Sequence, residues 1–259
     1  MPSWNQHQRQ LDQAGYLILP GVLERESLTH FKECVDRLFL KEGEDAGAEF
    51  RQEAGARRLA NLVNKGDLFG QLILHRTVRE AVQQILGNRY KLSSLNARSV
   101  PPRNGMRQPL HCDMGALPDA CGFWVCNCLW LLDDFRHDNG SLRVVPGTHL
   151  SGRLPGQVMD DPRHTHPREK ILTAPAGSVI VMNSHLWHGG LENRSDRSRT
   201  AIHAFFCRRD KPQQQYQKEL LSPGVQDVLS DELRELLALD DPENDRLSRS
   251  NPTTSGFLK

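Results

Sequence analysis

The hydrophobic residues of the first ~90 positions recur mainly at the spacing of amphipathic helices. Residues 27–39 and 77–86 each place their apolar side chains on one helical face. Between them, residues 42–58 are charged and rich in glycine and alanine, which favours a loop or a weak helix. Residues 16–19 form a short apolar run between turn residues and are predicted to be a strand.

From Tyr90 onward, short apolar runs alternate with turn residues such as Asn139-Gly140 and Pro146-Gly147. The predicted strands are residues 91–100, 109–113, 122–132, 141–145, 170–173, 178–183 and 199–207. A series of short, regularly punctuated strands is typical of an antiparallel double-sheet barrel or sandwich. We therefore expect a mainly β fold whose N-terminal helices pack against one sheet.

The length of 259 residues fits one domain at the upper end of the usual size. No internal repeat divides the chain, so residues 1–239 are predicted to form a single domain with its β core at about 90–210. Residues 240–259 are polar with little apolar pattern, and we expect them to be a flexible C-terminal tail.

Composition and charge narrow the class of partners. Lysine and arginine number 33 against 32 acidic residues, so no strong field would attract nucleic acid or an anionic membrane. No apolar run approaches the roughly 20 residues of a membrane helix, and the polar N-terminus lacks the core of a signal peptide. We therefore expect a cytoplasmic protein.

The six cysteines contain no C-x2-C pair typical of a zinc site. Cys126 and Cys128 alternate with tryptophans in an apolar run, which predicts that they are small buried hydrophobic residues. The cysteines are therefore not expected to take part in the chemistry.

Two candidate metal ligands lie close together in residues 110–113. If this segment is a strand, His111 and Asp113 point to one side while their neighbours point to the other. An imidazole and a carboxylate on one face can then bind the same metal ion. The tripeptide His-x-Asp alone is a weak signal, because it also occurs by chance.

A second imidazole is expected from the turn that follows the predicted strand 178–183. This stretch contains His185 and His188, and either could complete a set of two histidines and one carboxylate. That set is the facial triad of non-haem Fe(II) oxygenases, which leaves coordination positions open. A bidentate 2-oxo acid can occupy two of these positions and O2 the third.

Arg199 is the candidate for binding the distal carboxylate of 2-oxoglutarate. It begins the predicted strand 199–207, where its guanidinium could hold a carboxylate through two parallel hydrogen bonds. Arg194 and Arg197 compete for this role, but they lie in a polar loop where arginine is usually solvated.

Together these residues resemble the phytanoyl-CoA dioxygenase family. The resemblance is carried by residues 12–23 (DQAGYLILPGVL), His111-x-Asp113, residues 139–149 (NGSLRVVPGTH), Trp187-His188-Gly189 and Arg199, and it runs from about Gln10 to Cys207. It implies a double-stranded β-helix (jelly-roll, cupin-like) core, with Fe(II) as cofactor and 2-oxoglutarate and O2 as cosubstrates. The implied reaction is hydroxylation of an unactivated C–H bond, with release of succinate and CO2.

Carried over residue by residue, the resemblance makes His111, Asp113 and His188 the iron ligands and Arg199 the 2-oxoglutarate clamp. The spacing to Arg199 favours His188 over His185 as the second histidine. Trp130 is expected to line the cosubstrate pocket, within one residue. Family members that halogenate lack the carboxylate ligand, so the presence of Asp113 favours hydroxylation.

Two other functions are compatible with parts of this pattern. A jelly-roll protein that binds or senses a metal and a 2-oxo acid without turnover would keep the pocket, although an intact triad and Arg199 argue against it. A zinc hydrolase could use the same two histidines and aspartate, but it would need a general base and would not need Arg199.

Other histidines are expected to have lesser roles. His149 is predicted to close a turn through hydrogen bonds. His203 would share a strand face with Arg199, either packed in the core or in contact with the substrate. His164 and His166 lie in a charged loop and are expected to be solvated.

Residues 151–170 form a long segment of mixed charge, and we hypothesise that it is a lid over the site. Such a lid would suit a small polar or zwitterionic substrate. Residues 61–69 are the alternative location for substrate selectivity.

Overall fold

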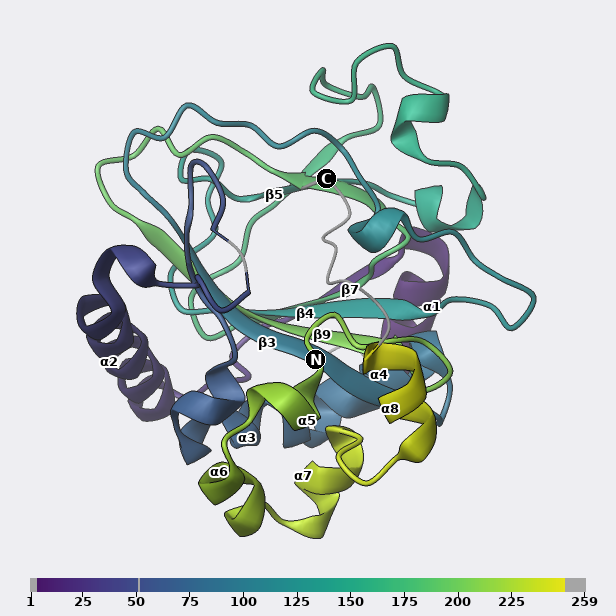
Figure 1. Ribbon diagram of the computed structural model, residues 1–259. Coiled ribbons are helices and arrows are strands. Elements are labelled where there is room, and N and C mark those ends of the chain that lie inside the picture. Colours follow the sequence, from purple (N-terminus) through teal and green to yellow (C-terminus); the bar gives the residue numbers. More distant parts are fainter. Residues whose placement is uncertain (1–3, 51, 250–259) are drawn as a thin grey trace.

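Two antiparallel sheets face each other in the computed structural model, which describes residues 4–50 and 52–249 (Figure 1). The larger sheet has the strand order β1-β7-β4-β9-β3-β2 and the smaller one the order β6-β5-β8. The strands are β1 (Tyr16–Leu19), β2 (Arg57–Leu59), β3 (Tyr90–Val100), β4 (Val125–Leu131), β5 (Leu142–Val145), β6 (Lys170–Leu172), β7 (Val179–Asn183), β8 (Trp187–Gly190) and β9 (Arg199–Arg208). Strands that are distant in sequence pair within each sheet, which confirms the predicted jelly-roll core.

Helices cover the face of the larger sheet that points away from the smaller sheet (Figure 1). The α-helices are α1 (Trp4–Ala14), α2 (Arg25–Glu42), α3 (Gly70–Leu74), α4 (Arg76–Leu86), α5 (Gln217–Leu220), α6 (Pro223–Val228), α7 (Asp231–Leu236) and α8 (Pro242–Arg249). Short 3-10 turns are η1 (Gly43–Asp45), η2 (Leu62–Lys65), η3 (Asp67–Phe69), η4 (Asp113–Gly115), η5 (Thr148–Leu150) and η6 (Pro155–Gln157). The predicted helices 27–39 and 77–86 correspond to α2 and α4, so the helical buttress is confirmed.

The alternation of side chains along β4 separates two hydrophobic cores. Cys126, Cys128 and Trp130 belong to the core between the larger sheet and the helices. Leu129 and Leu131 belong to the core between the two sheets. Successive side chains of a strand point to opposite faces. Alternate residues of β4 therefore pack against the helices or face the interior of the jelly roll.

The C-terminal tail predicted from Asp240 is wrong for its first part. Residues 242–249 form helix α8, in which Asn244 and Ser248 are buried. The Asn244 side chain accepts a hydrogen bond from the Lys91 ammonium group at 2.8 Å and donates one to Gln213 at 3.0 Å. A helix that docks through buried polar contacts has no apolar stripe, so its composition resembles that of a tail. Residues 250–259 lie outside the described residues.

Within the described residues, no helix combines the length and the apolar character needed to cross a membrane.

Candidate active site

The segment that carries His111 and Asp113 is not the regular strand that the sequence predicted. It runs beside β8, and the backbones of His111 and His188 exchange two hydrogen bonds, at 2.9 and 3.0 Å. Two residues later, the amide of Asp113 donates to the carbonyl of Ser184 at 2.9 Å, and the chain enters η4. These hydrogen bonds take the place of a regular strand pairing, and they keep the side chains of His111 and Asp113 directed toward β8.

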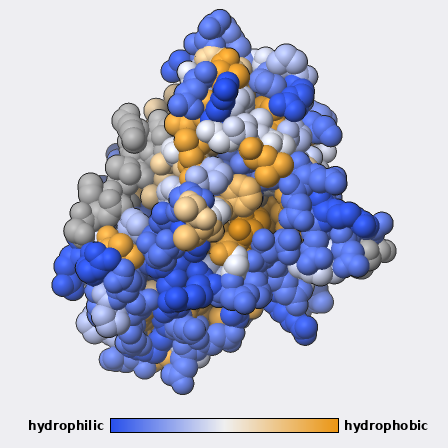
Figure 2. All heavy atoms as spheres, turned by 90° about the vertical axis from the view of Figure 1, so that its right-hand side faces the viewer, coloured by the Kyte–Doolittle hydropathy of each residue, from blue (hydrophilic) through white to orange (hydrophobic). Residues whose placement is uncertain are grey.

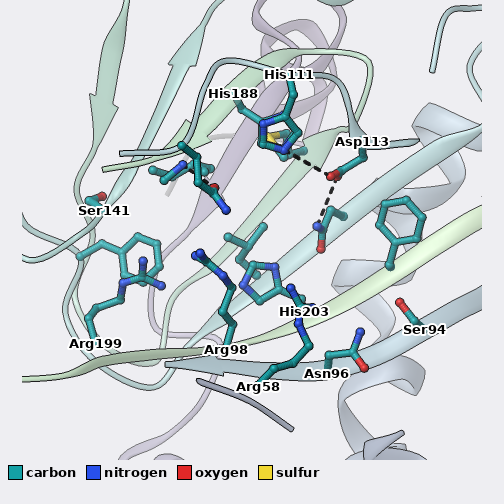
Figure 3. Close-up of a pocket in the computed structure, with 18 of the residues that line it drawn as sticks. Arg58, Ser94, Asn96, Arg98, His111, Asp113, Ser141, His188, Arg199 and His203 are labelled. Atoms are coloured by element: carbon teal, nitrogen blue, oxygen red, sulfur yellow. Dashed lines mark hydrogen bonds and ion pairs between the residues drawn. The ribbon is translucent and has the colours of Figure 1, made fainter. Parts of the chain in front are cut away.

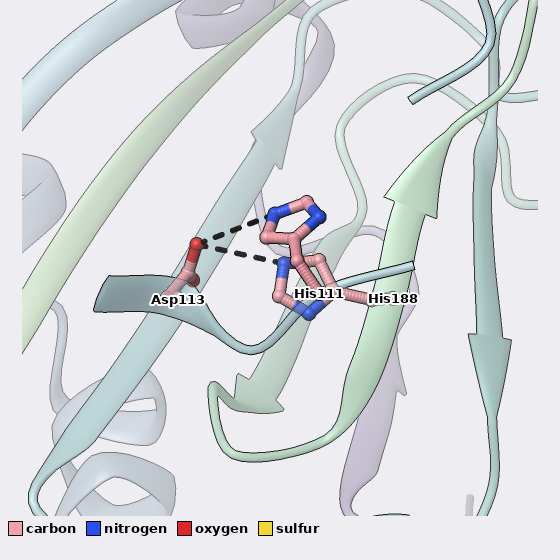
Figure 4. Close-up of side chains that lie close together, drawn as sticks. All are labelled: His111, Asp113 and His188. Carbon is pink, nitrogen blue, oxygen red and sulfur yellow. Dashed lines mark ion pairs between the residues drawn. The ribbon is translucent and has the colours of Figure 1, made fainter. Parts of the chain in front are cut away.

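His111, Asp113 and His188 converge at one point of the interior (Figure 4). One potential ligand atom from each residue lies within 4.8 Å of the other two. The Asp113 Oδ1 atom is 3.8 Å from His111 Nε2 and 3.5 Å from His188 Nε2. The three donor groups, two imidazoles and one carboxylate, have a spacing that fits one metal ion held on one side, which is the arrangement of a facial triad.

Backbone carbonyls orient both imidazole rings. His111 Nδ1 lies 2.9 Å from the carbonyl oxygen of Pro109, and His188 Nδ1 lies 2.8 Å from that of Leu186. A carbonyl can only accept, so each Nδ1 carries the hydrogen and each Nε2 keeps its lone pair. This bond to the second ring nitrogen is the usual way in which proteins fix a metal-binding histidine.

Burial and mutual contact set the charges of these groups. Burial, together with the nearby His188, lowers the pKa of His111 to about 3. Burial alone would raise the pKa of Asp113, but His188 and His111 hold it well below its ordinary value. Burial would lower the pKa of His188, yet the Asp113 carboxylate raises it. The carboxylate is therefore ionised and can act as an anionic ligand.

His185, the alternative second histidine, does not reach this cluster. It is buried against the rings of Phe123 and Trp124, and its Nδ1 lies 2.9 Å from Asn183 Oδ1. His149 is also buried, and its Nε2 lies 3.1 Å from the carbonyl oxygen of Asp12 in α1. The predicted structural role of His149 is confirmed, but its hydrogen bond joins the turn after β5 to the N-terminal helix instead of closing the turn itself.

Arg199 lies at the start of β9, with its guanidinium 4.3 Å from the ring centroid of Phe135 and hydrogen-bonded to the Gly140 carbonyl. Its Nε is buried without a hydrogen-bond partner, and no carboxylate of the described residues forms an ion pair with it. Burial, and secondarily Arg98, lowers the pKa of Arg199 to about 9, so it remains a cation at neutral pH. A buried cation that lacks a carboxylate partner is suited to receive one from a ligand.

Arg194 and Arg197 are exposed on the preceding loop, so Arg199 is the arginine of the three that faces the interior.

Trp130 does not line this cavity, which corrects the prediction. Its ring is fully buried among the helices and packs edge-on against His75, with centroids 5.6 Å apart. Leu129, one residue earlier, takes the position in the cavity wall. The prediction was off by one residue, and a shift of one residue moves a side chain to the other face of a strand.

The triad and Arg199 open into one cavity between the two sheets (Figure 3). Its lining residues are Arg58, Ser94, Asn96, Arg98, Gln108, His111, Asp113, Asn127, Leu129, Phe135, Ser141, Leu142, Met182, His188, Gly190, Arg199, His203, Phe205 and Gln214. His203 faces the cavity on the same side of β9 as Arg199, as strand periodicity predicted. The wall opposite the triad is polar, and β3 contributes Ser94, Asn96 and Arg98 to it (Figure 3).

Sequence reasoning missed several polar residues of the site. Arg58 and Arg98 reach the cavity from β2 and β3. Arg143 lies in β5 and is fully buried, with hydrogen bonds to the carbonyls of Gln108 and Pro162 at 2.8 Å each. An arginine within an apolar strand was the available signal for Arg143, because a buried charge requires fixed partners.

Residues 151–170 contribute no side chain to the cavity, so the structure does not support the lid hypothesis. The segment lies at the upper right of Figure 1 and is tied down by Arg143 and by the Leu110 amide, which donates to Pro162. Leu154 and Met159 pack against Trp187, on the outer side of β8. Figure 2 shows the side of the molecule that lies on the right in Figure 1, where hydrophobic residues gather in a hollow framed by hydrophilic ones. Residues 61–69 do not line the cavity either. They contact its wall through the Asn61 amide, which donates a hydrogen bond to Asn96 Oδ1 of β3 at 3.3 Å.

Known proteins resemble this chain in sequence and in fold. An uncharacterized protein of Mycobacterium tuberculosis is 28% identical over 219 residues, which cover 80% of this chain and 76% of the relative. The crystal structure of HygX from Streptomyces hygroscopicus, with nickel and 2-oxoglutarate bound, has a TM-score of 0.65 at 16% identity and covers 80% of this chain and 88% of its own. That of SnoK, a non-heme alpha ketoglutarate dependent carbocyclase from nogalamycin biosynthesis, has a TM-score of 0.63 at 20% identity and covers 79% and 84%.

The sequence model described as phytanoyl-CoA dioxygenase (PhyH) matches residues 11–201. This span reaches from the N-terminal helix to Arg199 and includes the triad, so it covers most of the jelly roll. The chain belongs to the phytanoyl-CoA dioxygenase family.

Proposed function

We propose that this protein is an Fe(II)- and 2-oxoglutarate-dependent dioxygenase that hydroxylates an unactivated C–H bond of a small molecule and releases succinate and CO2. The observation that carries the proposal is the convergence of His111, Asp113 and His188 in the cavity that also contains Arg199. Two imidazoles and one carboxylate are the ligand set that iron oxygenases use, and a buried arginine that forms no ion pair with a described carboxylate suits a dicarboxylate cosubstrate.

Each residue has a defined task in this proposal. His111 and His188 would hold iron through their Nε2 atoms, since the Nδ1 atoms are engaged by backbone carbonyls. Asp113 would supply the third ligand as an anion. An iron ion held there would supply the oxidising chemistry. Arg199 would bind the distal carboxylate of 2-oxoglutarate and so orient the cosubstrate toward the metal.

The reaction type follows from Asp113. A carboxylate in this position occupies the metal site that a halide would need, so we propose hydroxylation and not halogenation. The SnoK carbocyclase has the same fold and is named for a different reaction, so fold alone does not select hydroxylation. Product analysis by mass spectrometry in the presence of chloride should detect added oxygen and no chlorine.

Matched histidine variants test the metal site. We expect His188→Ala to abolish Fe(II)-dependent binding of 2-oxoglutarate under anaerobic conditions, because the variant loses one of three ligands. His185→Ala is the control, since it removes an equally buried imidazole outside the cluster. Isothermal titration calorimetry of both variants, checked for folding by circular dichroism, provides the measurement. Loss of binding in His185→Ala but not in His188→Ala would contradict the assignment.

A screen of candidate substrates for coupled succinate release tests the activity itself. A protein that binds iron and 2-oxoglutarate but never releases succinate would be the binding or sensing protein, and the proposed function would be wrong. The cytoplasmic location expected from the sequence stays a prediction.

A further inference from the structure

A second hollow adjoins the catalytic cavity. It has a volume of about 240 Å³, whereas the cavity that contains the triad has about 90 Å³. Arg98, Gln108 and Gly190 line both hollows, so the two meet at these residues. We call the second hollow the outer groove. Most of its other walls come from the end of β3 and the chain that follows it, from the turn at residues 54–55 and from Leu191.

Hydrogen bonds hold the walls of the outer groove in place. The backbone amide of Gln108 donates to the carbonyl of Gly190, and that of Asn193 donates to the carbonyl of Asn104, each at 2.9 Å. The Asn104 side chain in turn donates to the carbonyl of Gly55. These bonds join three segments that are far apart in sequence. The groove is therefore formed before a ligand binds, as is usual for small-molecule sites.

Apolar side chains contribute much of the groove's lining, namely Ala54, Val100, Met106, Pro109 and Leu191. Met106 is 52% exposed and lies over Gly55, where a Cβ atom would be 2.6 Å from the Met106 sulfur. An exposed, flexible thioether can adapt to apolar groups of different shape. The arginines added by the groove are Arg107, which pairs with Glu169 at 2.9 Å, and Arg163, whose side chain is 70% exposed. The groove thus offers an apolar surface beside a polar catalytic cavity.

The volumes indicate that a substrate needs both hollows. The catalytic cavity of about 90 Å³ would also have to contain the cosubstrate, which leaves little space for a second molecule. Small-molecule sites usually have roughly 300–1,000 Å³, and neither hollow reaches this range by itself. The cavity and the outer groove together reach its lower end. A substrate whose reacting atom lies near the triad therefore has room for its remainder in the groove.

The boundary between cavity and groove lies close to the metal site, since Gly190 follows His188 by two residues. The Gly190 amide donates to Gln108 Oε1 at 2.8 Å. A Cβ atom at Gly190 would lie 3.0 Å from that oxygen and 3.5 Å from Arg98 Nη1. Because residue 190 has no side chain, Gln108 and Arg98 can lie against the main chain there, and Arg98 points on into the cavity (Figure 3). A molecule that crosses this boundary from the groove arrives beside the triad.

We propose that the outer groove is a substrate subsite, which binds an apolar group, a branched alkyl chain or an aromatic ring, while the polar part of the same molecule enters the catalytic cavity. This inference rests on the proposed function and names the substrate class of the same site. The substrate is accordingly amphipathic. It differs from the wholly polar or zwitterionic substrate expected from residues 151–170, because the groove walls that adjoin the cavity are largely apolar.

Neutral probes test the subsite through the methionine methyl groups in NMR spectra. The protein, isotope-labelled at these methyl groups, is loaded with Zn(II), which is diamagnetic and does not turn over, and is saturated with 2-oxoglutarate. N-acetyl-L-leucinamide and N-acetyl-L-phenylalaninamide are titrated beside N-acetylglycinamide, which lacks the apolar group. Met106 reports on the groove, Met182 on the cavity, and Met159, packed on the outer side of β8, is the internal control.

We expect Met106 and Met182 to shift together, with one Kd, for at least one of the two apolar probes. That probe should bind about tenfold or more tightly than N-acetylglycinamide, because its apolar group is removed from water. An unchanged Met106 signal with both apolar probes would overturn the inference. A shift of Met106 without Met182 would also overturn it, since the groove would then be an apolar surface that does not serve the cavity.

A matched pair of variants makes the test specific. Met106→Gln places an amide in the groove wall and should weaken binding of the apolar probe by about threefold or more, followed through Met182. Val158→Gln is the control, because Val158 is equally exposed, at 51%, and lies outside the groove. A Kd that Met106→Gln leaves unchanged would contradict the subsite.

The affinity for 2-oxoglutarate, measured before each titration, distinguishes the two proposals. If the Zn(II)-loaded wild type does not bind 2-oxoglutarate, the proposed function is wrong and the inference falls with it. If 2-oxoglutarate binds and the apolar probes leave Met106 unchanged, the inference alone is wrong.

Discussion

At the scale of single residues, the hydrogen bonds of each side chain decide which of its atoms faces the cavity. The two candidate ligand histidines, His111 and His188, direct Nε2 into the cavity because their Nδ1 atoms are held by carbonyls two residues earlier in the chain. Arg199 is likewise held in place by the Gly140 carbonyl and by the ring of Phe135, while its Nε has no hydrogen-bond partner among the described residues. Side chains whose orientation is already fixed in this way need little further ordering when a ligand binds.

The shape of the Arg199 side chain leads to a prediction. Arg199→Lys keeps the charge but loses the planar pair of donors, so 2-oxoglutarate binding should weaken by about 1–3 kcal/mol. The Kd for 2-oxoglutarate, measured anaerobically with Fe(II), is the readout. Arg197→Lys, an exposed position on the neighbouring loop, should leave the Kd unchanged. An equal Kd in the wild type and Arg199→Lys would mean that another group binds the distal carboxylate.

At the scale of elements, the irregular segment before η4 depends on β5 for its position. Arg143 binds the carbonyls of Gln108, Pro162 and His164, and it pairs with Glu169 at 2.9 Å. The residue after Gln108 is Pro109, whose carbonyl holds the ring of His111. A buried arginine thus connects a strand of the smaller sheet to the segment that carries two of the three candidate ligands.

Replacing this arginine should affect both stability and metal binding. Arg143→Met leaves Glu169 and three carbonyls with fewer partners, which should lower the free energy of unfolding by about 3–5 kcal/mol. In the protein that remains folded, Fe(II) affinity should fall because the His111 segment loses its anchor. Chemical denaturation and a metal titration measure the two effects. Arg136→Met removes an exposed ion pair with Asp138 and should change neither. Wild-type metal affinity in folded Arg143→Met would rule out the anchoring role.

At the scale of the whole molecule, the C-terminal helices complete the core begun by the N-terminal ones. Leu236 and Leu237 belong to the same hydrophobic cluster as Phe31 of α2 and Val82 of α4. Helix α8 adds polar contacts, since Asn244 binds the buried Lys91 of β3. The helical layer therefore joins both ends of the described chain across one face of the larger sheet (Figure 1).

The contact between α8 and β3 should be measurable as stability. Asn244→Ala removes the side-chain acceptor from the Lys91 ammonium group, and we expect the free energy of unfolding to fall by about 1–3 kcal/mol. Glu243→Ala, the preceding and exposed residue of α8, should change it by less than about 0.5 kcal/mol. Urea denaturation followed by circular dichroism compares the two. Equal stability of both variants would show that α8 docks without this bond.

The sequence alone determined the class of fold and the candidate metal-binding residues. Short apolar runs bounded by turn residues, from Tyr90 onward, predicted most strands, because both signals are local properties of the chain. The motif positions singled out His111, Asp113, His188 and Arg199, and all four line one cavity. Local patterns and short motifs depend on neighbours in sequence, which is why they could be read without a structure.

Tertiary structure alone decided which side chains meet. Trp130 and Leu129 differ by one position, and only the packing of helices on the larger sheet shows which of them faces the cavity. The convergence of Arg58 and Arg98 on Glu53 joins three segments with no shared motif. Helix α8 docks through polar contacts that hydrophobic patterning does not register. In each case the deciding contact joins residues far apart in sequence, and such contacts follow from the packing of the whole chain.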